Sequence, residues 1–481
     1  MDDGHRPSRG RQAVEIIVSR ERHGIVHLLR KGAPLGVVSA RLVHAKSDQL
    51  SALLPAAVLA GRSDALQWLC SSLGGFGSNT HPDRHEEQDG PRYWDAFYTS
   101  YYVDQALGFA SAVRHVDAIE CLLTLANGRY DVAHRVDAMI DKVASDAAER
   151  GDVDIVRVVH DYRKKPDGSC ACRKEIGQRA LHTDRVAVIE ALHGLGCAAV
   201  STVAQGDLDE AVCMGSIGAV RWLIERTRSS SVGESSIVTA SRGGFASTVA
   251  FVHDSGLCAC PYQALVAAAA GGHIDVLRWA AGESTATVPS ERSRPIDAWY
   301  GGTRIAHAAV ACGHAAIVVW MAERPDAGRT LDVGVARAAL ANGMLDAAMA
   351  LHDARVAPFG TWDALSTAMR LKDQGIVKEV ARHGALCDGE AVREALRFGE
   401  PDTLACLHER YGISDARLQE AVDRTVGLAF RYPTMVWIRD NVPGVCVKAL
   451  AQCGIEHDWP SSWENDALFS CACVHCTAPT C

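Results

Sequence analysis

The chain has 481 residues, of which 48% are hydrophobic and 22% are charged. This length exceeds what a single hydrophobic core organises, so we expect several domains or a solenoid, and the apolar content argues against disorder throughout. The net charge is −9 with acids and bases interspersed, which disfavours nucleic acid as a partner because a phosphate backbone is repelled.

Residues 1–12 are polar, and we expect a flexible N-terminal tail without the apolar core of a signal peptide. The apolar run from Ala264 to Ala270 is far shorter than the roughly 18 residues that span a bilayer. We therefore expect a cytoplasmic protein that is neither secreted nor bound to a membrane. The 17 cysteines are an odd number without a compact framework, and their placement at apolar repeat positions predicts reduced, buried thiols: Cys121, Cys213, Cys312 and Cys406.

A helix–turn–helix pattern recurs through residues 13–465. Its clearest copy is AAAAGGHIDVLRWAA at 267–281, and AAVLAGRSDALQWL at 56–69 has the same form. Taking the turn glycine or its equivalent as the anchor of each unit gives about thirteen units, most of them about 30 residues apart. The anchors are Glu21, Gly61, Arg114, Gly151, Asp184, Gly215, Gly244, Gly272, Gly313, Gly343, Lys372, Gly399 and Phe430.

The position four residues before the anchor tests this register independently. It is alanine in eleven of the thirteen units: Ala57, Ala110, Ala147, Ala180, Ala211, Ala240, Ala268, Ala309, Ala339, Ala368 and Ala395. A small side chain with high helix propensity suits a point where helices cross closely. The pattern predicts an all-α solenoid in which the first helices of the units stack through this alanine.

The residues after the anchor predict a second helix. Aspartate often stands three residues on, where it favours a helix N-terminus, and apolar residues follow at a helical spacing. Tryptophan recurs seven residues after the anchor, at Trp68, Trp222, Trp279, Trp320 and Trp437, and we expect it to pack in the core. Histidine directly after the anchor, at His115, His273 and His314, is expected to fix the turn by a hydrogen bond.

This pattern resembles the ankyrin repeat, and most closely the divergent ankyrin-repeat families of giant DNA viruses of amoebae. The resemblance implies paired antiparallel helices, a concave surface for protein partners, and a host protein as partner in the host-cell cytoplasm. The TPLH tetrapeptide of the family is absent and many units are shorter than the usual repeat, so we expect the fingers to be reduced to short turns. No F-box is evident before the repeats.

Two insertions interrupt the spacing, near residues 74–102 and 282–303. Each runs from a polar stretch into an aromatic one, RYWDAFYTSYY in the first and IDAWYGG in the second. Long loops on one face of a solenoid often form its binding face. The alternative is that the aromatic residues only hold the loop against the stack.

Residues 466–481 form a Cys-rich C-terminal tail. Cys473 and Cys476 are spaced as zinc ligands, and Cys453 with His457 could complete a site, whereas the alternative is a flexible cysteine-rich end. The Cys170-x-Cys172 and Cys258-x-Cys260 pairs fall between units and are interpreted as loop residues.

The phosphate-binding, zinc-protease and nucleophile-elbow motifs of enzymes are absent from the sequence. We therefore assign no catalytic, cofactor or metal residues, and predict a non-enzymatic protein–protein interaction scaffold or adaptor. The alternatives are a zinc-binding or ubiquitin-ligase-recruiting adaptor that acts through the C-terminal cysteines, and a structural virion component.

Overall fold

The computed structural model describes residues 24–42, 45, 47–74, 91–128, 130–201, 205–227, 231–285, 302–398, 401–425 and 432–446. Within these ranges the chain is all-helical and forms no β-strand, and an isolated antiparallel bridge joins Lys164 to Cys170. The predicted all-α class is confirmed. No described helix is both long and apolar enough to cross a membrane.

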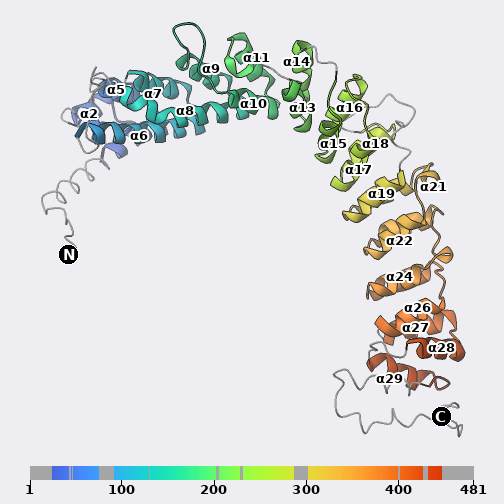
Figure 1. Cartoon of the computed structure of the whole chain (residues 1–481). Coiled ribbons are helices and arrows are strands. Elements are labelled where there is room, and N and C mark those ends of the chain that lie inside the picture. The colour runs from blue at the N-terminus through green and yellow to red at the C-terminus, as the bar shows by residue number, and fades with distance from the viewer. Residues whose placement is uncertain are drawn as a thin grey trace, which may run out of the picture. The chain divides into compact units, whose positions relative to one another are not determined.

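The chain divides into two compact units, residues 1–232 and 233–481, and each is described by itself. The helices of the first unit are α2 (Leu35–Ala40), α3 (Ser47–Ser51), α4 (Leu54–Leu59), α5 (Ser63–Gly74), α6 (Pro91–Ala112), α7 (Val116–Gly128), α8 (Tyr130–Arg150), α9 (Val153–Tyr162), α10 (Lys174–His182), α11 (Val186–Gly194), α12 (Ala198–Ser201), α13 (Gln205–Cys213) and α14 (Ile217–Thr227). First helices α4, α6, α8 and α10 pack on one another in sequence order, as do second helices α5, α7, α9 and α11 (Figure 1).

The second unit repeats this arrangement. Its helices are α15 (Glu234–Arg242), α16 (Ala246–Asp254), α17 (Tyr262–Gly271), α18 (Ile274–Ala280), α19 (Gly302–Ala311), α20 (Ala315–Ala322), α21 (Ala327–Thr330), α22 (Val333–Ala341), α23 (Leu345–Asp353), the 3-10 turn η2 (Phe359–Thr361), α24 (Ala364–Arg370), α25 (Gln374–Arg382), α26 (Gly389–Phe398), α27 (Pro401–Tyr411), α28 (Asp415–Thr425) and α29 (Tyr432–Asn441). First helices α15, α17, α19, α22, α24, α26 and α28 pack in sequence order. Such neighbour-to-neighbour packing is compatible with a repeat solenoid, while the repeat count and the ankyrin type remain predictions.

In each helix pair whose turn the structure describes, the first helix is followed by a turn whose anchor residue has a left-handed backbone conformation. All ten predicted anchors in the described residues have positive φ, including the non-glycine residues Arg114, Asp184 and Lys372. The alanine four residues earlier accepts a hydrogen bond from the residue after the anchor, as His314 N–H donates to the Ala309 carbonyl over 2.8 Å. All eleven predicted alanines have no exposed surface. The alanine therefore closes the helix end and also lies where neighbouring first helices meet.

Hydrogen bonds join each of several turns to the preceding one. The donor is the side chain of the residue directly after the anchor of one turn. The acceptor is a backbone carbonyl of the preceding helix pair, two residues before the anchor of that pair's turn. We call such a hydrogen bond a seam bond. Arg185 Nε donates to Glu149 O over 3.0 Å, Ser216 Oγ to His182 O over 2.8 Å, and His314 Nε2 to Ala270 O over 3.1 Å. Of the histidines expected to fix the turn, His115 accepts the Ala118 N–H at Nδ1 over 3.3 Å, whereas His314 makes its bond to the neighbouring pair. A carbonyl at a helix C-terminus lacks a partner within its own helix, and the seam bond supplies one.

The second helices begin with the predicted aspartates in their first turn: Asp64, Asp117, Asp154, Asp275, Asp346 and Asp402. Trp222, Trp279 and Trp320 are buried, as expected of core residues, while Trp68 and Trp437 are half-buried. A histidine on the preceding second helix meets the tryptophan edge-on, with ring centroids 5.5 Å apart for both His193–Trp222 and His253–Trp279. The tryptophan column is packing between second helices.

Candidate functional site

A short hairpin, residues 163–173, connects α9 to α10. The Ala171 N–H donates to the Arg163 carbonyl over 2.9 Å, and the Lys165 N–H donates to the Ser169 carbonyl over 2.7 Å. At its tip, Gly168 has φ +85°, a conformation that favours glycine, and the Asp167 carboxylate accepts from the Ser169 N–H over 2.9 Å. The hairpin turns the chain back, so that residues following the tip lie beside the end of α9.

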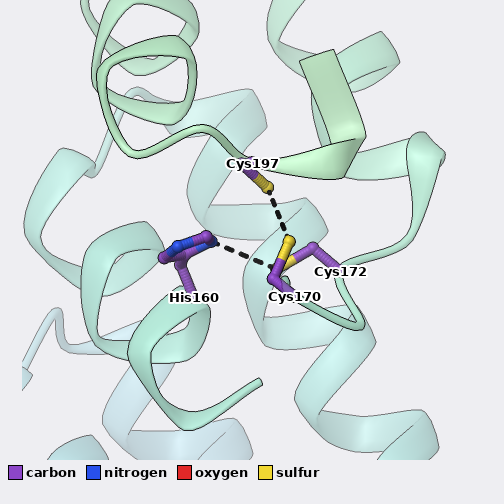
Figure 2. Close-up of side chains that lie close together, drawn as sticks. All are labelled: His160, Cys170, Cys172 and Cys197. Atoms are coloured by element: carbon purple, nitrogen blue, oxygen red, sulfur yellow. Dashed lines mark hydrogen bonds between the residues drawn. The ribbon is translucent and has the colours of Figure 1, made fainter. Parts of the chain in front are cut away.

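Four potential metal ligands meet at the base of this hairpin: His160, Cys170, Cys172 and Cys197. Their ligand atoms all lie within 4.8 Å of one another. The Cys170 thiol donates to the Cys197 sulfur with 3.5 Å between the two Sγ atoms, and the Cys172 Sγ is 3.6 Å from His160 Nδ1. Figure 2 shows the four side chains pointing toward one another. Among the described residues, this is the one group of three or more histidine, cysteine or acidic side chains whose ligand atoms are close enough together to hold a metal ion.

Each ligand has a defined position in the fold. His160 is buried in the last turn of α9, and Cys170 and Cys172 lie on the returning arm of the hairpin. Cys197 follows the left-handed Gly196 that ends α11, and its N–H donates to the Leu192 carbonyl over 2.9 Å. It is fully buried, so its sulfur faces the interior beneath the hairpin. The ligands therefore come from two consecutive helix pairs, α8–α9 and α10–α11.

The local electrostatics favour a thiolate at this point. Hydrogen bonding from the Cys172 thiol lowers the pKa of Cys197 to about 5, with a smaller contribution from the Ala199 backbone N–H. The same contact, with burial, raises the pKa of Cys172. The backbone N–H of Ala198 also donates to Cys170 Sγ over 3.3 Å. Negative charge on sulfur is therefore stabilised by N–H and S–H donors inside the cluster.

An acidic residue of α8 holds both arms of the hairpin. One carboxylate oxygen of Asp141 is 2.8 Å from Arg163 Nη2, and the other is 2.6 Å from Arg173 Nε. The side chains of Asp141 and Arg163 are 13% and 14% exposed, so this ion pair is shielded from solvent more than a surface pair is. Asp141 thereby fixes the two ends of the segment that carries Cys170 and Cys172.

The sequence interpretation of these cysteines was incomplete. Cys170 and Cys172 do lie in the connecting segment between helix pairs, but the fold adds His160 and Cys197 to them. Among the residues that the structure describes, the similar pair Cys258 and Cys260 gathers no such group. The predicted zinc ligands Cys453, His457, Cys473 and Cys476 lie outside the described residues.

The expectation of buried thiols is wrong for part of the set. Every described cysteine is a free thiol, but Cys312 is exposed, and Cys121, Cys213 and Cys406 are half-buried. Cys312 lies in the turn, between the last residue of α19, Ala311, and the anchor Gly313, and its side chain is exposed there. The repeat position alone does not bury a cysteine there.

A second feature is an exposed aromatic face on α6. Phe97, Tyr98, Tyr101 and Phe109 are 39%, 42%, 50% and 39% exposed. Tyr98, Tyr101 and Phe109 are spaced by about one and two helical turns, so they form one stripe, which also includes Gln105. Gln105 Nε2 donates to the Tyr101 hydroxyl over 2.7 Å. We call these four residues, Tyr98, Tyr101, Gln105 and Phe109, the α6 stripe.

The α6 stripe overlaps the first predicted insertion. Residues 75–90 lie outside the described residues, but the aromatic stretch after them forms the start of α6 and not a loop. Its residues Thr99, Val103 and Ala106 are buried on the opposite side. Of the second insertion, residues 286–301 lie outside the described residues.

Comparison with known proteins supplies no assignment for either feature. No protein-family model matches the chain, and no curated protein matches it.

Proposed function

We propose that the chain is a non-enzymatic protein–protein interaction scaffold or adaptor built on ankyrin-like repeats. The observation that carries the proposal is the α6 stripe, a row of aromatic side chains left exposed on a helix that is otherwise packed into the stack. Large aromatic residues contribute most of the energy at the centres of protein interfaces, because they bury much area while losing little conformational entropy. The stripe therefore suits a protein partner.

The rigidity of the platform supports this proposal. First helix α6 packs between α4 and α8, and second helix α7 packs behind it. Ala106, Leu107 and Ala110 anchor α6 without any exposed surface. A side chain on such a helix is held in place before a partner arrives, which reduces the ordering cost of association. The exposed Leu59 of neighbouring α4 adds apolar surface on a first helix.

The test removes the stripe without touching the core. A triple variant, Tyr98→Gln, Tyr101→Gln and Phe109→Gln, is compared with the wild-type chain by quantitative affinity purification from cells that express it naturally. The matched control is Leu386→Gln, which changes an apolar residue that is 60% exposed in the second unit. Thermal unfolding of all three proteins verifies that the fold is kept.

We expect the wild-type chain and the control to recover a protein partner in stoichiometric amount. The triple variant should bind this partner at least about tenfold more weakly. Recovery of no stable partner by the wild-type chain would argue against a scaffold. Equal recovery by the triple variant would show that the stripe is not the interface. If the chain accumulates in purified virus particles and no partner is recovered with it, the virion-component alternative is favoured.

A further inference from the structure

The donor set and its spacing match a tetrahedral metal site. Zinc has bonds of about 2.3 Å to sulfur and about 2.1 Å to nitrogen, so neighbouring ligand atoms around it lie roughly 3.5 to 3.8 Å apart. The Cys170–Cys197 sulfur separation is 3.5 Å, and the Cys172 sulfur to His160 Nδ1 separation is 3.6 Å. Three thiolates and one imidazole are among the usual ligand sets of structural zinc. Soft sulfur ligands in a tetrahedron select zinc over magnesium or calcium.

The histidine differs from its counterparts in other pairs. His253 and His352 stand nine residues after their anchors, as His160 does, and each accepts a backbone N–H seven residues later. The Cys260 N–H donates to His253 Nδ1 over 2.9 Å, and the Phe359 N–H donates to His352 Nδ1 over 3.0 Å. The same nitrogen of His160 faces the Cys172 sulfur instead. Where other pairs use this histidine to fix the backbone, the α8–α9 pair directs it at a thiol.

Cys197 also departs from its counterparts. In three other pairs the residue after the left-handed end of the second helix is a buried apolar side chain, Leu257, Ala385 or Ile413, whereas after α18 it is Glu283. Packing alone is satisfied by such residues. The cysteine at this position lies opposite two more cysteines on the hairpin, so three sulfur atoms converge where packing requires none.

We propose that His160, Cys170, Cys172 and Cys197 bind one zinc ion in a closed, structural site. The four ligands fill the tetrahedron, so no position is left for a substrate or an activated water. On binding, the cysteine thiols lose their protons to solvent and coordinate as thiolates, while His160 coordinates through Nδ1. The ion joins the α9–α10 hairpin to the end of α11 and thereby links two consecutive helix pairs.

The surroundings supply the support that such a site needs. The Ala198 N–H donates to Cys170 Sγ over 3.3 Å, and Asp141 holds both arms of the hairpin. Outer contacts of this kind orient ligands and stabilise the thiolate charge. A disulfide between Cys170 and Cys197 is the competing chemistry, and it would leave Cys172 and His160 without a common function.

The experiment measures zinc in the purified full-length chain by elemental analysis and records the absorption of the cobalt-substituted protein. The test variant is Cys170→Ser with Cys197→Ser, and the matched control is Cys258→Ser with Cys260→Ser, the pair without a gathered ligand set. His160→Gln provides an independent ligand removal. Each variant is also unfolded thermally with and without added zinc.

We expect the test variant to hold one zinc fewer per chain than the wild type and the control, whatever the C-terminal cysteines bind. Zinc affinity at the site should fall by more than about a hundredfold, because removing a ligand exceeds the effect of an outer-shell change. Added zinc should raise the melting temperature of metal-free wild type but not of the test variant. Tetrahedral cobalt–thiolate bands should appear only when all four ligands are present.

Three results would overturn the proposal. The zinc content could be equal in wild type and test variant, the cobalt spectrum could lack thiolate bands, or mass spectrometry of the freshly purified chain could find a Cys170–Cys197 disulfide. If the Cys→Ser variant fails to fold, the His160→Gln variant and zinc titration of the metal-free wild-type chain decide the matter. No zinc binding in that titration would exclude the site.

Discussion

The imidazole of His314 lies directly over Gly272, the turn glycine of the preceding helix pair. A Cβ built on Gly272 would be 2.7 Å from Cε1 of His314. The same ring donates the seam bond to Ala270 O over 3.1 Å. Gly272 is therefore required twice, once for its positive φ and once for the space that the ring occupies.

Gly272→Ala and Gly313→Ala separate these two requirements. Both residues have positive φ, but no atom of the described residues lies within 4 Å of a Cβ built on Gly313. Gly313→Ala should cost about 1 kcal/mol of unfolding free energy from backbone strain alone. Gly272→Ala should cost roughly 2–4 kcal/mol, because the ring must also move and its hydrogen bond is weakened. Chemical denaturation measures the difference, and equal costs would contradict the packing of His314 on Gly272.

Arg355→Gly should stabilise the protein. Arg355 has φ +58° at the end of α23, where other second helices end in Gly196, Gly256 or Gly384. Relief of the left-handed strain outweighs the greater entropy of glycine in the unfolded chain, so the expected gain is about 0.5–1 kcal/mol. Thermal unfolding should show a higher melting temperature.

Asp184→Gly is the informative contrast to that change. Asp184 is also left-handed, with φ +57°, but its carboxylate accepts the Ala219 N–H over 2.7 Å. Removing this charge-assisted bond should outweigh the relief of strain and lower the unfolding free energy by about 1–2 kcal/mol. A stabilised Asp184→Gly variant would mean that the bond to α14 contributes little.

Ala309→Leu should loosen the stack locally. Ala309 has no exposed surface in α19, which packs between α17 and α22, whereas Ala311 of the same helix is exposed. The larger side chain should cost about 1–3 kcal/mol or more, and Ala311→Leu should be near neutral. Hydrogen exchange should accelerate first in α17, α19 and α22. Uniform acceleration over the whole chain would be inconsistent with a stack of neighbouring units.

Asp141→Asn should release the hairpin. Asp141 is shielded from solvent and holds Arg163 and Arg173, so the loss of its charge should lower the free energy of unfolding by roughly 1–3 kcal/mol. If the zinc proposal holds, the affinity for zinc should also fall about tenfold to a hundredfold. Asp154→Asn is the control, because that carboxylate is 77% exposed and 3.8 Å from Arg157. Hydrogen exchange of residues 163–173 and zinc titration check this prediction. If the exchange rates and the zinc affinity are both unchanged in Asp141→Asn, other contacts hold the hairpin.

Much of the fold could be predicted from the sequence because the repeat constrains local backbone geometry. The register placed Arg114, Asp184 and Lys372 at the turn anchor, and all three have positive φ although none of them is glycine. The burial of the alanine column followed from the same register. Local rules of helix termination and helix packing act within one or two units, so a single sequence contains them.

The candidate metal site could not be predicted in this way. Its ligands occupy three separate segments, and a C-x-C pair on a connecting loop lacks the usual spacing of zinc ligands. What brings them together is the reversal of the hairpin at Gly168 and the way α11 stacks on α9. A signal was nevertheless present: Cys197 stands where several other units carry a buried apolar residue. The aromatic stretch that contains Tyr98 and Tyr101 was predicted as a candidate binding face, but it was interpreted as part of a loop, whereas it belongs to α6.

The seam bonds have a consequence for how such a chain can change its length. Their acceptor is a main-chain carbonyl, which no substitution removes, and their donor can be arginine, serine or histidine. The α10–α11 pair does both: Arg185 donates to the pair before it, and the His182 carbonyl accepts from the pair after it. Duplication or loss of such a pair would join compatible edges, whereas an inverted pair would not fit. Tandem duplication of the gene segment that encodes such a pair therefore lengthens the stack while keeping the same interface between neighbouring pairs.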